Sequence, residues 1–406
     1  MPRKLFFEIL FAIFLGIFAG IFTGLFPGVH INLVAIVVLN SSLFLLNYFS
    51  PLSLALFIVA MSITHTFLDA IPSIFLGAPD SGLELSVLPG HKLLLEGRGY
   101  EAVFLTVVGS FFAVVVCLLI SPIMIPLIRN GYPYVEPYVA YILIFFSVVL
   151  ILREPKSKFW ALIVYLMSGA FGIAVLTMPS LKQPLFPMLS GLFGISILVV
   201  TLMQKTKIPE QRITYPKLNV KEVLSYLGLG TIASLLVGTM PGLGSSQAAI
   251  ISSSIKKKNK PENFLIMLGS INTFVMIISF VALYSIDKAR NGSVVVISKI
   301  LGEFNFGYLV LFLVVSLFVA GVASILCLKI SRVFSEFMSK VNYRVLCMGV
   351  ISLIIILVFV IDGPNFLGLL VLTVSSLLGI FTSLVGIGKN HLMGCLLLPV
   401  ILFFLL

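Results

Sequence analysis

Residues 234–247 read SLLVGTMPGLGSSQ, and residues 20–32 read GIFTGLFPGVHIN. In each stretch a small residue, a glycine four positions later and a Pro-Gly pair three positions after that glycine close an apolar run. Proline removes a backbone donor and glycine relaxes the limits on backbone conformation, so each pair breaks a helix. The pairs, Pro27-Gly28 and Pro241-Gly242, stand slightly more than half of the chain apart.

The composition around these breaks is that of a membrane protein. Of the 406 residues, 60% are hydrophobic and 10% are charged, against roughly 25% charged residues in soluble domains, and the mean hydropathy is +1.19. Apolar runs at 5–26, 138–152, 185–203 and 345–361 have lengths near those that cross a bilayer as helix. They lack the alternation of a β-barrel strand. The sequence therefore predicts an all-α polytopic membrane protein with about 10–14 membrane segments.

The N-terminal run resembles a signal peptide in its basic start. It is longer than a signal peptide, however, and meets no small-residue cleavage site, so we expect it to be retained as structure. The formal charge of +11 comes from Lys and Arg in short loops. This pattern predicts contact with lipid headgroups and membrane orientation, and we expect no nucleic-acid partner.

The four cysteines carry no metal-site spacing. Cys117, Cys327, Cys347 and Cys395 lie in or beside apolar runs, without CxxC pairs or neighbouring histidines. We expect them to be small buried hydrophobes and expect no metal and no cofactor, apart from a coupling Na⁺ or H⁺.

The chain divides into two related halves. Residues 64–80 align with residues 271–287, and this alignment supports the internal repeat that the two Pro-Gly motifs indicate. We predict a first transmembrane repeat at 1–203, a polar connecting loop at 204–220 and a second repeat at 221–406. The expected segments of the two repeats are 5–26, 29–49, 52–78, 80–99, 101–128, 138–152, 158–178 and 185–203, and then 221–240, 245–255, 263–287, 288–305, 308–335, 345–361, 366–386 and 391–406.

Basic loops predict opposite orientations for the two halves. The positive-inside rule puts 153–158, 205–221 and 329–344 on the cytoplasmic side. We expect a loop at 129–137, the equivalent of 329–344, one span away from 153–158. The halves would then be inverted repeats, as in many secondary transporters, with Arg3 and Lys4 facing outward against the rule.

The paired breaks are candidate substrate sites. Broken helices at membrane depth are tolerated where they line a cavity, and their free N–H groups suit an anion. Polar residues gather beside both breaks, and the alternative for the serines is helix capping and close packing. The predicted substrate-binding set is Pro27, Gly28, His30, Asn32, Pro241, Gly242, Gly244, Ser245, Ser246, Gln247, Asn272 and Thr273.

Ionisable residues inside spans are candidates for ion coupling, because each is costly in lipid. Asp69 is the most interior, and we predict that it couples transport to protons or sodium. His65 and Asp80 complete the predicted set, with a plain interior hydrogen bond as the alternative for His65 and a re-entrant turn for Asp80. Asn272, which the repeat pairs with His65, keeps that position polar.

Ordered motifs across most of the chain resemble TctA, the large membrane subunit of the tripartite tricarboxylate transporters. The similarity includes both Pro-Gly motifs and four further stretches: 71–79 (IPSIFLGAP), 88–92 (LPGHK), 96–102 (EGRGYEA) and 261–264 (PENF). Family members usually have Pro-Gly-Leu-Gly in both halves, whereas the first half here has Pro27-Gly28-Val29-His30. The family's Asn-rich segment is reduced to 269–273 (GSINT). The resemblance therefore implies a distant branch of the family. It supports the membrane fold and a transport function better than it supports citrate-like specificity.

The resemblance implies a permease of a prokaryotic plasma membrane that moves a small anionic solute, a carboxylate. A small membrane subunit and an external solute-binding protein are partners that only the resemblance suggests. A second reading is a translocase of a lipid-linked phosphate such as polyprenyl phosphate, since a Pro-Gly break with hydroxyls also suits a phosphate. A membrane enzyme is disfavoured, because the sequence shows no acid–base pair, metal site or Walker motif.

Overall fold

The computed structural model describes residues 2–26, 31–77, 85, 87–203, 209–238, 244–255, 260–289, 291–338, 340, 342–362 and 366–406. These residues form helices and connecting loops, and no strand occurs among them. The predicted all-α class is confirmed.

The helices of the two halves of the chain have the following bounds, in chain order. The elements of the first half are α1 (Pro2–Leu25), α2 (Ile31–Asn40), α3 (Ser42–Leu45), α4 (Pro51–Leu68), η1 (Pro72–Leu76), α5 (Val87–Leu95), α6 (Gly99–Val135), η3 (Glu136–Tyr138), α7 (Val139–Leu152), α8 (Lys158–Leu176), α9 (Leu185–Leu189), η4 (Ser190–Ile195) and α10 (Ser196–Met203). Those of the second half are α11 (Val220–Gly238), α12 (Ser245–Ile255), α13 (Pro261–Ile286), α14 (Gly292–Leu301), α15 (Phe306–Met338), α16 (Tyr343–Asp362), α17 (Leu367–Val385), η5 (Lys389–Met393) and α18 (Gly394–Leu405).

Within the described residues, nine helical stretches are long and apolar enough to cross a membrane. Three shorter apolar helices, Gly292–Leu301, Arg344–Val360 and Lys389–Leu405, accompany them. The chain is therefore a multi-pass membrane protein. The exact division into two repeats at 204–220 stays a prediction.

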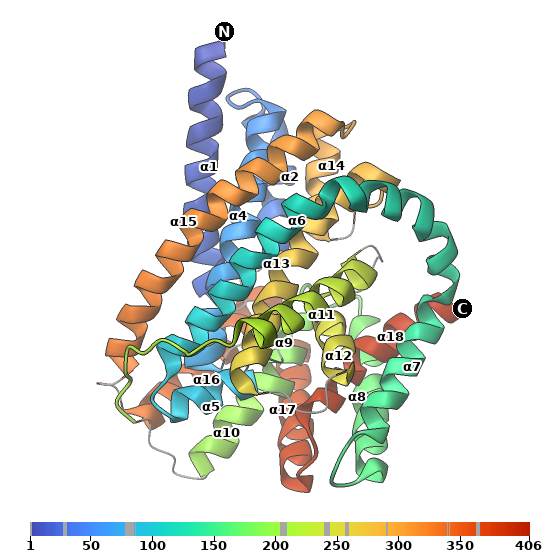
Figure 1. Ribbon diagram of the computed structural model, residues 1–406. Coiled ribbons are helices and arrows are strands. Elements are labelled where there is room, and N and C mark those ends of the chain that lie inside the picture. Colours follow the sequence, from blue (N-terminus) through green and yellow to red (C-terminus); the bar gives the residue numbers. More distant parts are fainter. Residues whose placement is uncertain are drawn as a thin grey trace.

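The expected loop at 129–137 is wrong. α6 continues to Val135 and passes through η3 into α7, although Pro122, Pro126 and Pro133 lie inside it. Each proline removes one helical hydrogen bond, which bends a helix without ending it when neighbouring helices support the backbone. Figure 1 shows the result, a long arc in which α6 curves over into α7.

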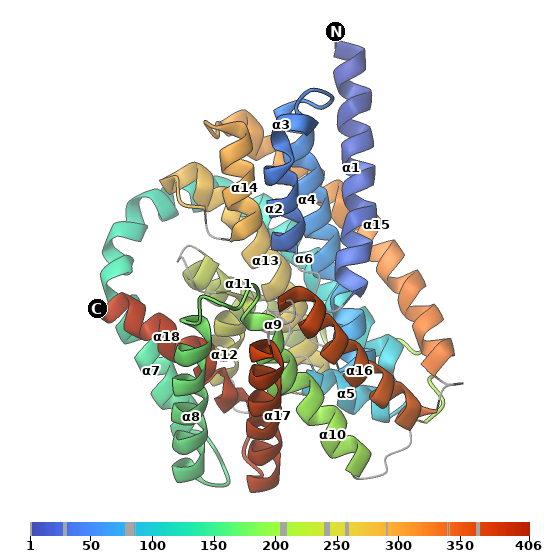
Figure 2. The same ribbon diagram turned by 180° about the vertical axis from the view of Figure 1, so that it is seen from behind.

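Two helices form the centre of the bundle. In both Pro51–Leu76 and Pro261–Ile286, 94% of the most apolar window is buried inside the protein. α1 packs along α4 and α11 along α13, while α6 packs against α13 and α15 against α4. α6 and α15 also contact each other and run in opposite directions (Figures 1 and 2). Opposite directions are what inverted repeats predict for equivalent helices.

Small residues set the spacing of the α6–α13 interface. A Cβ atom at Gly109 would collide with the carbonyl oxygen of Ile266, and one at Gly269 would collide with that of Thr106. Ser110 Oγ donates a hydrogen bond to the Gly269 carbonyl oxygen at 3.0 Å. The two backbones therefore meet directly, in the way that small-residue motifs pack membrane helices.

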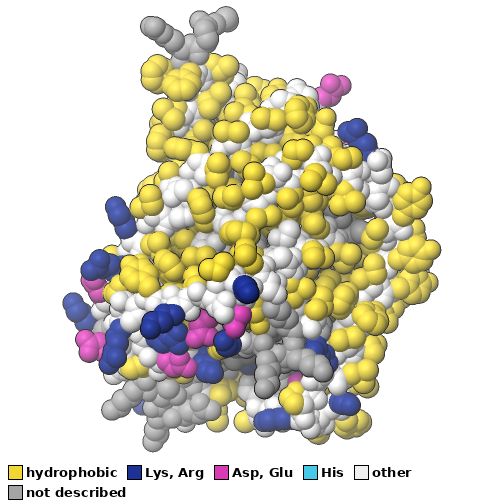
Figure 3. Space-filling view, viewed as in Figure 1, with side chains coloured by type: hydrophobic (Ala, Val, Ile, Leu, Met, Phe, Trp, Pro, Cys, Tyr) yellow, Lys and Arg dark blue, Asp and Glu magenta, His cyan; other side chains and the backbone are white. Residues whose placement is uncertain are grey.

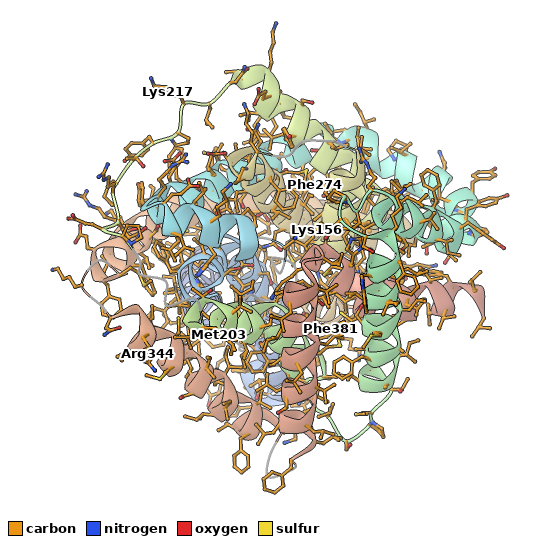
Figure 4. All side chains as sticks on the ribbon, turned by 90° about the horizontal axis from the view of Figure 1, so that it is seen from below. Lys156, Met203, Lys217, Phe274, Arg344 and Phe381 are labelled. Carbon is orange, nitrogen blue, oxygen red and sulfur yellow. The ribbon has the colours of Figure 1, made fainter. Side chains whose placement is uncertain are left out.

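Charged residues concentrate at one end of the molecule. Figure 3 shows Lys, Arg, Asp and Glu gathered in its lower part, below a surface that is mostly apolar. Seen from below, Lys217 of the connecting loop and Arg344 at the start of α16 lie at the periphery (Figure 4). The N-terminus lies at the opposite end of the molecule from the end of α15 (Figure 1). This separation is the one that the basic loops predicted, and which end is cytoplasmic stays a prediction.

Two of the motif stretches meet at the charged end. Arg98, in the EGRGYEA stretch, forms ion pairs with Glu101 (2.6 Å) and with Glu262 (3.0 Å), in the PENF stretch. The hydrogen bond with Glu101 is the main cause that raises the pKa of Arg98 above its ordinary value. Gln211 of the connecting loop accepts a hydrogen bond from Gly99 N at 3.0 Å. The start of α6 is thus tied both to α13 and to the connecting loop.

We predict that Gly109→Ala lowers the melting temperature of the purified protein by a few degrees. The added Cβ meets a backbone carbonyl that cannot move aside, and overpacking of this kind costs roughly 1–3 kcal/mol. The matched control is Gly321→Ala in α15, where no atom lies within 4 Å of the new Cβ. That variant should be neutral or slightly stabilised, and equal losses in both variants would contradict the assigned interface.

Candidate functional site

The central helix of the first half is interrupted directly after Asp69. Pro72 cannot donate a backbone hydrogen bond, and residues 72–76 continue as a π-helix that ends at Gly77 with φ of 63°. Short π-helical segments inside α-helices are often found at functional sites. Asp69 is 2% exposed. The interruption therefore coincides with a buried carboxylate at the centre of the bundle.

Asn272 of α13 faces this carboxylate. Its Nδ2 donates a hydrogen bond to Asp69 Oδ2 at 2.8 Å and a longer one to the Thr66 carbonyl oxygen at 3.5 Å. Thr273 Oγ1 donates to Thr66 Oγ1 at 3.2 Å. All four side chains are buried. The structure thus brings together three residues predicted from the sequence, Asp69, Asn272 and Thr273, from two different halves of the chain.

The start of α12 joins the same network. Ser245 Oγ donates to Asn272 Oδ1 at 3.3 Å. Because Asn272 gives its amide protons to two acceptors, its oxygen is the atom left to accept from the serine. Gly244 N donates to Gln247 Oε1 at 2.8 Å, which caps the first turn of α12. Ser246 and Gln247 are buried at the same helix start. A chain of hydrogen bonds, which we call the central network, therefore runs from Ser245 through Asn272 to Asp69.

His65 lies one turn before Asp69 and contacts α1. Its Nδ1 lies 3.2 Å from Thr23 Oγ1, which donates to the Gly20 carbonyl oxygen. A Cβ at Gly20 would lie 2.5 Å from the Thr64 Cβ, so this glycine lets α1 approach α4 closely. The structure thus gives His65 the interior hydrogen bond that was the alternative to a coupling role, and the coupling role stays a prediction.

Asn32 binds the start of a neighbouring helix. Its Oδ1 accepts a hydrogen bond from Ser293 N at 3.0 Å, at the N-terminus of α14. Contact of Asn32 with a solute stays a prediction. Of the other predicted site residues, Pro27, Gly28, His30, Asp80, Pro241 and Gly242 lie outside the described residues.

Several polar residues near these sites were not predicted. Thr23 and Thr66 form hydrogen bonds inside the bundle, and a second buried cluster contains Glu154, Ser196, Lys389 and His391. A threonine in an apolar run carries a weak signal, since its hydroxyl can bond its own helix. Lys389 and His391 carried little signal, because basic residues are common in the short loops between apolar segments.

His91, in the 88–92 motif, is buried on α5 beside η1. Burial lowers the pKa of its imidazole to about 4, and a hydrogen bond to the backbone of Ile74 opposes part of this shift. A Cβ at neighbouring Gly90 would lie 2.7 Å from Ile74, so α5 and η1 pack closely. His91 is therefore neutral in the folded protein at physiological pH.

We predict that stability falls as the pH drops from about 6.5 to about 4. In that window the unfolded chain protonates His91 and the folded chain does not, which removes up to about 3 kcal/mol. His91→Gln should flatten the decline in melting temperature between pH 7 and pH 5. The same slope in both proteins would contradict a buried neutral imidazole.

We also predict that Ser245→Ala together with Ser246→Ala weakens binding of an anionic solute by several-fold to about a hundredfold. Removing up to two hydrogen bonds at the start of α12 costs about 0.5–1.5 kcal/mol each. Affinity and melting temperature should be measured on the same purified protein. Intact affinity with lowered stability would show that these serines only cap and pack the helix.

Comparison with known proteins shows the family to which this chain belongs. The model of the tripartite tricarboxylate transporter TctA family matches residues 10–394. The uncharacterized protein MJ1079 of Methanocaldococcus jannaschii is 31% identical over 372 residues, which cover 90% of this chain and 92% of that protein. No solved structure matches the chain. The resemblance seen in the motifs is confirmed, and the chain belongs to the tripartite tricarboxylate transporter TctA family, whose members are components of secondary transporters.

Proposed function

We propose that this chain is a permease that moves a small carboxylate across the membrane by alternating access around the central network. A gradient of sodium or protons drives the movement. The observation that carries the proposal is the hydrogen-bonded chain of Ser245, Asn272 and Asp69 at the centre of an apolar bundle. Family membership supports transport as the general activity.

Burying the polar groups of this network is energetically unfavourable, which indicates that they have a function. A carboxylate held away from water loses its hydration, and the amide hydrogen bond from Asn272, worth about 1.5–3 kcal/mol, offsets only part of that loss. Asp69 and Asn272 nevertheless lie on the two most buried helices. Polar groups placed at such depth in membrane proteins line pathways for ions or solutes.

The α12 start supports an anion as the solute. The first N–H groups of a helix have no partner within the helix, and the helix dipole favours negative charge there. Gln247 Oε1 accepts the Gly244 N–H, and Ser245 and Ser246 are the first two residues of α12. Short polar side chains at a helix start can bind carboxylate oxygens.

The surroundings of Asp69 support ion coupling. The Asp69 carboxylate, the Thr66 hydroxyl and the Thr66 carbonyl oxygen lie around Asn272 and Thr273. Interrupted helices in transporters bind sodium through such side-chain and backbone oxygens, and a carboxylate can instead carry a proton. Asp69 is therefore the residue that we assign to coupling with sodium or a proton.

The transporter has further proposed parts. A small membrane subunit and an external solute-binding protein would work with this chain in a prokaryotic plasma membrane, because the family is that of a tripartite transporter. The chain would act as a permease and not as an enzyme. Translocation of a lipid-linked phosphate is the alternative function. The two functions are distinguished by measuring, in proteoliposomes, the uptake of carboxylates and the transfer of polyprenyl phosphate.

We predict that Asp69→Asn abolishes gradient-driven carboxylate uptake in proteoliposomes and leaves the protein folded. The isosteric amide keeps the shape of the side chain and removes the charge that a proton or sodium ion binds. Uptake should be measured with a sodium gradient and with a pH gradient, alongside size-exclusion elution of the purified protein.

The matched control is Asp287→Asn, the same change at an exposed position after α13. Asp287 has φ of 51°, a conformation that asparagine also tolerates. This variant should transport like the wild type. Undiminished uptake by Asp69→Asn, with the same ion dependence, would remove Asp69 from the mechanism.

A further inference from the structure

The helices that follow the two Pro-Gly pairs are counterparts in the internal repeat. Counted from the two prolines, residues 31–40 align without a gap with residues 245–254. The stretches share an alanine followed by two branched apolar residues, Ala35-Ile36-Val37 in the first and Ala249-Ile250-Ile251 in the second. Each stretch begins a helix, α2 in the first half and α12 in the second.

The two counterpart helices nevertheless lie in different surroundings. α12 packs against α11, α13 and α7, and residues 245–252 are all buried. α2 packs against α4 and α14, and it leaves Ile36 and Val37 44% and 56% exposed. Both views show α2 beside α14, toward the end of the molecule that holds the N-terminus (Figures 1 and 2). The helix after the break thus lies inside the bundle in one half and at its side in the other.

Asn32 fastens α2 to the start of α14. Its Oδ1 accepts a hydrogen bond from Ser293 N at 3.0 Å, and the next N–H, that of Val294, donates to Asn291 Oδ1 at 2.9 Å. A Cβ atom on Gly292 would lie 2.9 Å from Asn32 Cγ, so the two helices meet closely here. The first N–H groups of a helix have no acceptor within the helix. Asn32 therefore caps a helix that belongs to the other half of the chain.

α5 is the counterpart of α14. The alignment of residues 64–80 with residues 271–287 continues through both helices, where it pairs Ser86-Val87, Lys92 and Leu94 with Ser293-Val294, Lys299 and Leu301. α14 packs against α4, and α5 packs against α13. Across the described residues, however, α12 does not pack against α5 as α2 packs against α14. The two halves therefore differ in where the helix after the break is seated.

The composition of α12 suits the position that α2 occupies. The two exposed residues of α2 correspond to the isoleucines at 250–251, which are as apolar as lipid. Asn32 corresponds to Ser246, whose hydroxyl can also accept a hydrogen bond from the N–H groups at a helix start. Ser245 corresponds to Ile31, which is 5% exposed. Seated on α5, α12 would therefore turn its isoleucines to lipid and keep these two serines against protein.

We propose that α2 and α12 are the moving elements of alternating access and that they exchange positions between its two states. In the state seen here, α12 lies in the central network and α2 caps α14 through Asn32. In the opposite state, α12 leaves Asn272 and packs against the start of α5, while α2 leaves α14 and packs along α1. Inverted repeats that exchange conformations open a central site first to one side of the membrane and then to the other. The inference rests on the proposed function, to which it adds the helices that move.

Two designed disulfides report the two states. Asn32→Cys with Gly292→Cys joins α2 to α14, because the Cβ atoms would lie 3.1 Å apart, slightly below the usual disulfide span of roughly 3.5–4.5 Å. Ser246→Cys with Leu85→Cys is the equivalent pair on α12 and before α5. The first pair should close in the state seen here and the second in the opposite state.

The exchange predicts that a variant with all four cysteines closes one disulfide or the other in each molecule. Oxidation in proteoliposomes, alkylation and intact-mass measurement count the disulfides, and peptide mapping identifies them. We expect both kinds of singly cross-linked molecule and none with both disulfides. Molecules that carry both, or an 85–246 disulfide that never forms with or without citrate, would overturn the exchange.

Asn32→Ala tests the cap on α14 in the variant that carries the 85–246 pair alone. Losing the hydrogen bond from Ser293 N should favour the opposite state and raise the yield of the 85–246 disulfide about two- to tenfold. The matched control is Asn47→Ala, which removes an exposed asparagine whose Nδ2 donates to the Leu43 carbonyl oxygen one turn away. The control should leave the yield unchanged. The same yield in Asn32→Ala as in the control would contradict a cap that holds one state.

Uptake separates this inference from the proposed function. Oxidised protein with the 32–292 disulfide should lose most of its carboxylate uptake and regain it on reduction, whereas each single cysteine variant should transport. Full uptake by protein with this disulfide closed would overturn the exchange alone. The count of disulfides does not depend on the solute, so a wild type that takes up no carboxylate would overturn the proposed function while the disulfides still decide the exchange.

Discussion

The hydrogen bond between Asn272 and Asp69 is the contact around which this protein is organised. It joins α4 and α13, the two helices that apolar neighbours surround almost completely, and it does so beside the π-helical interruption of the first. A carboxylate at this depth requires a donor, and an amide can donate to it while its oxygen accepts from a third group. Ser245 supplies that group, so a single asparagine links two helices of the second half to the first.

Around this centre, helices of the first half of the chain pack against helices of the second half. α6 of the first half packs on α13 of the second, and α15 of the second packs on α4 of the first. Glycines let α6 and α13 touch backbone to backbone, and the pairing of Arg98 with Glu262 ties one end of this interface. At the other end, Lys288 pairs with Glu136 at 2.9 Å and with the Tyr132 hydroxyl at 3.0 Å. The α6–α13 pair is thus fixed at both ends, which suits a frame against which other helices move.

The sequence predicted the helical membrane fold and three members of the central network. Apolar run length predicted the spans, polar residues inside those runs marked Asp69 and Asn272, and the serines after the second Pro-Gly break marked Ser245. The expected loop at 129–137 was wrong because it was placed as the counterpart of the basic stretch 329–344, whereas α6 continues through this region to Val135. Which side chains meet could not be read from one sequence. The bond of Asn32 to Ser293 N depends on α2 lying beside α14, and the position of Lys389 depends on η4 lying beside α17.

Accessibility of Ser245 from the two sides of the membrane tests alternating access around the central network most directly. Ser245→Cys differs from the wild type by one atom, and the four native cysteines, all buried, give a low background. Vesicles of each orientation should be treated with a membrane-impermeant thiol reagent, with and without citrate. Alternating access around the central network predicts labelling from both sides and protection by citrate. Labelling from one side alone, or from both sides at a rate that citrate leaves unchanged, would contradict it.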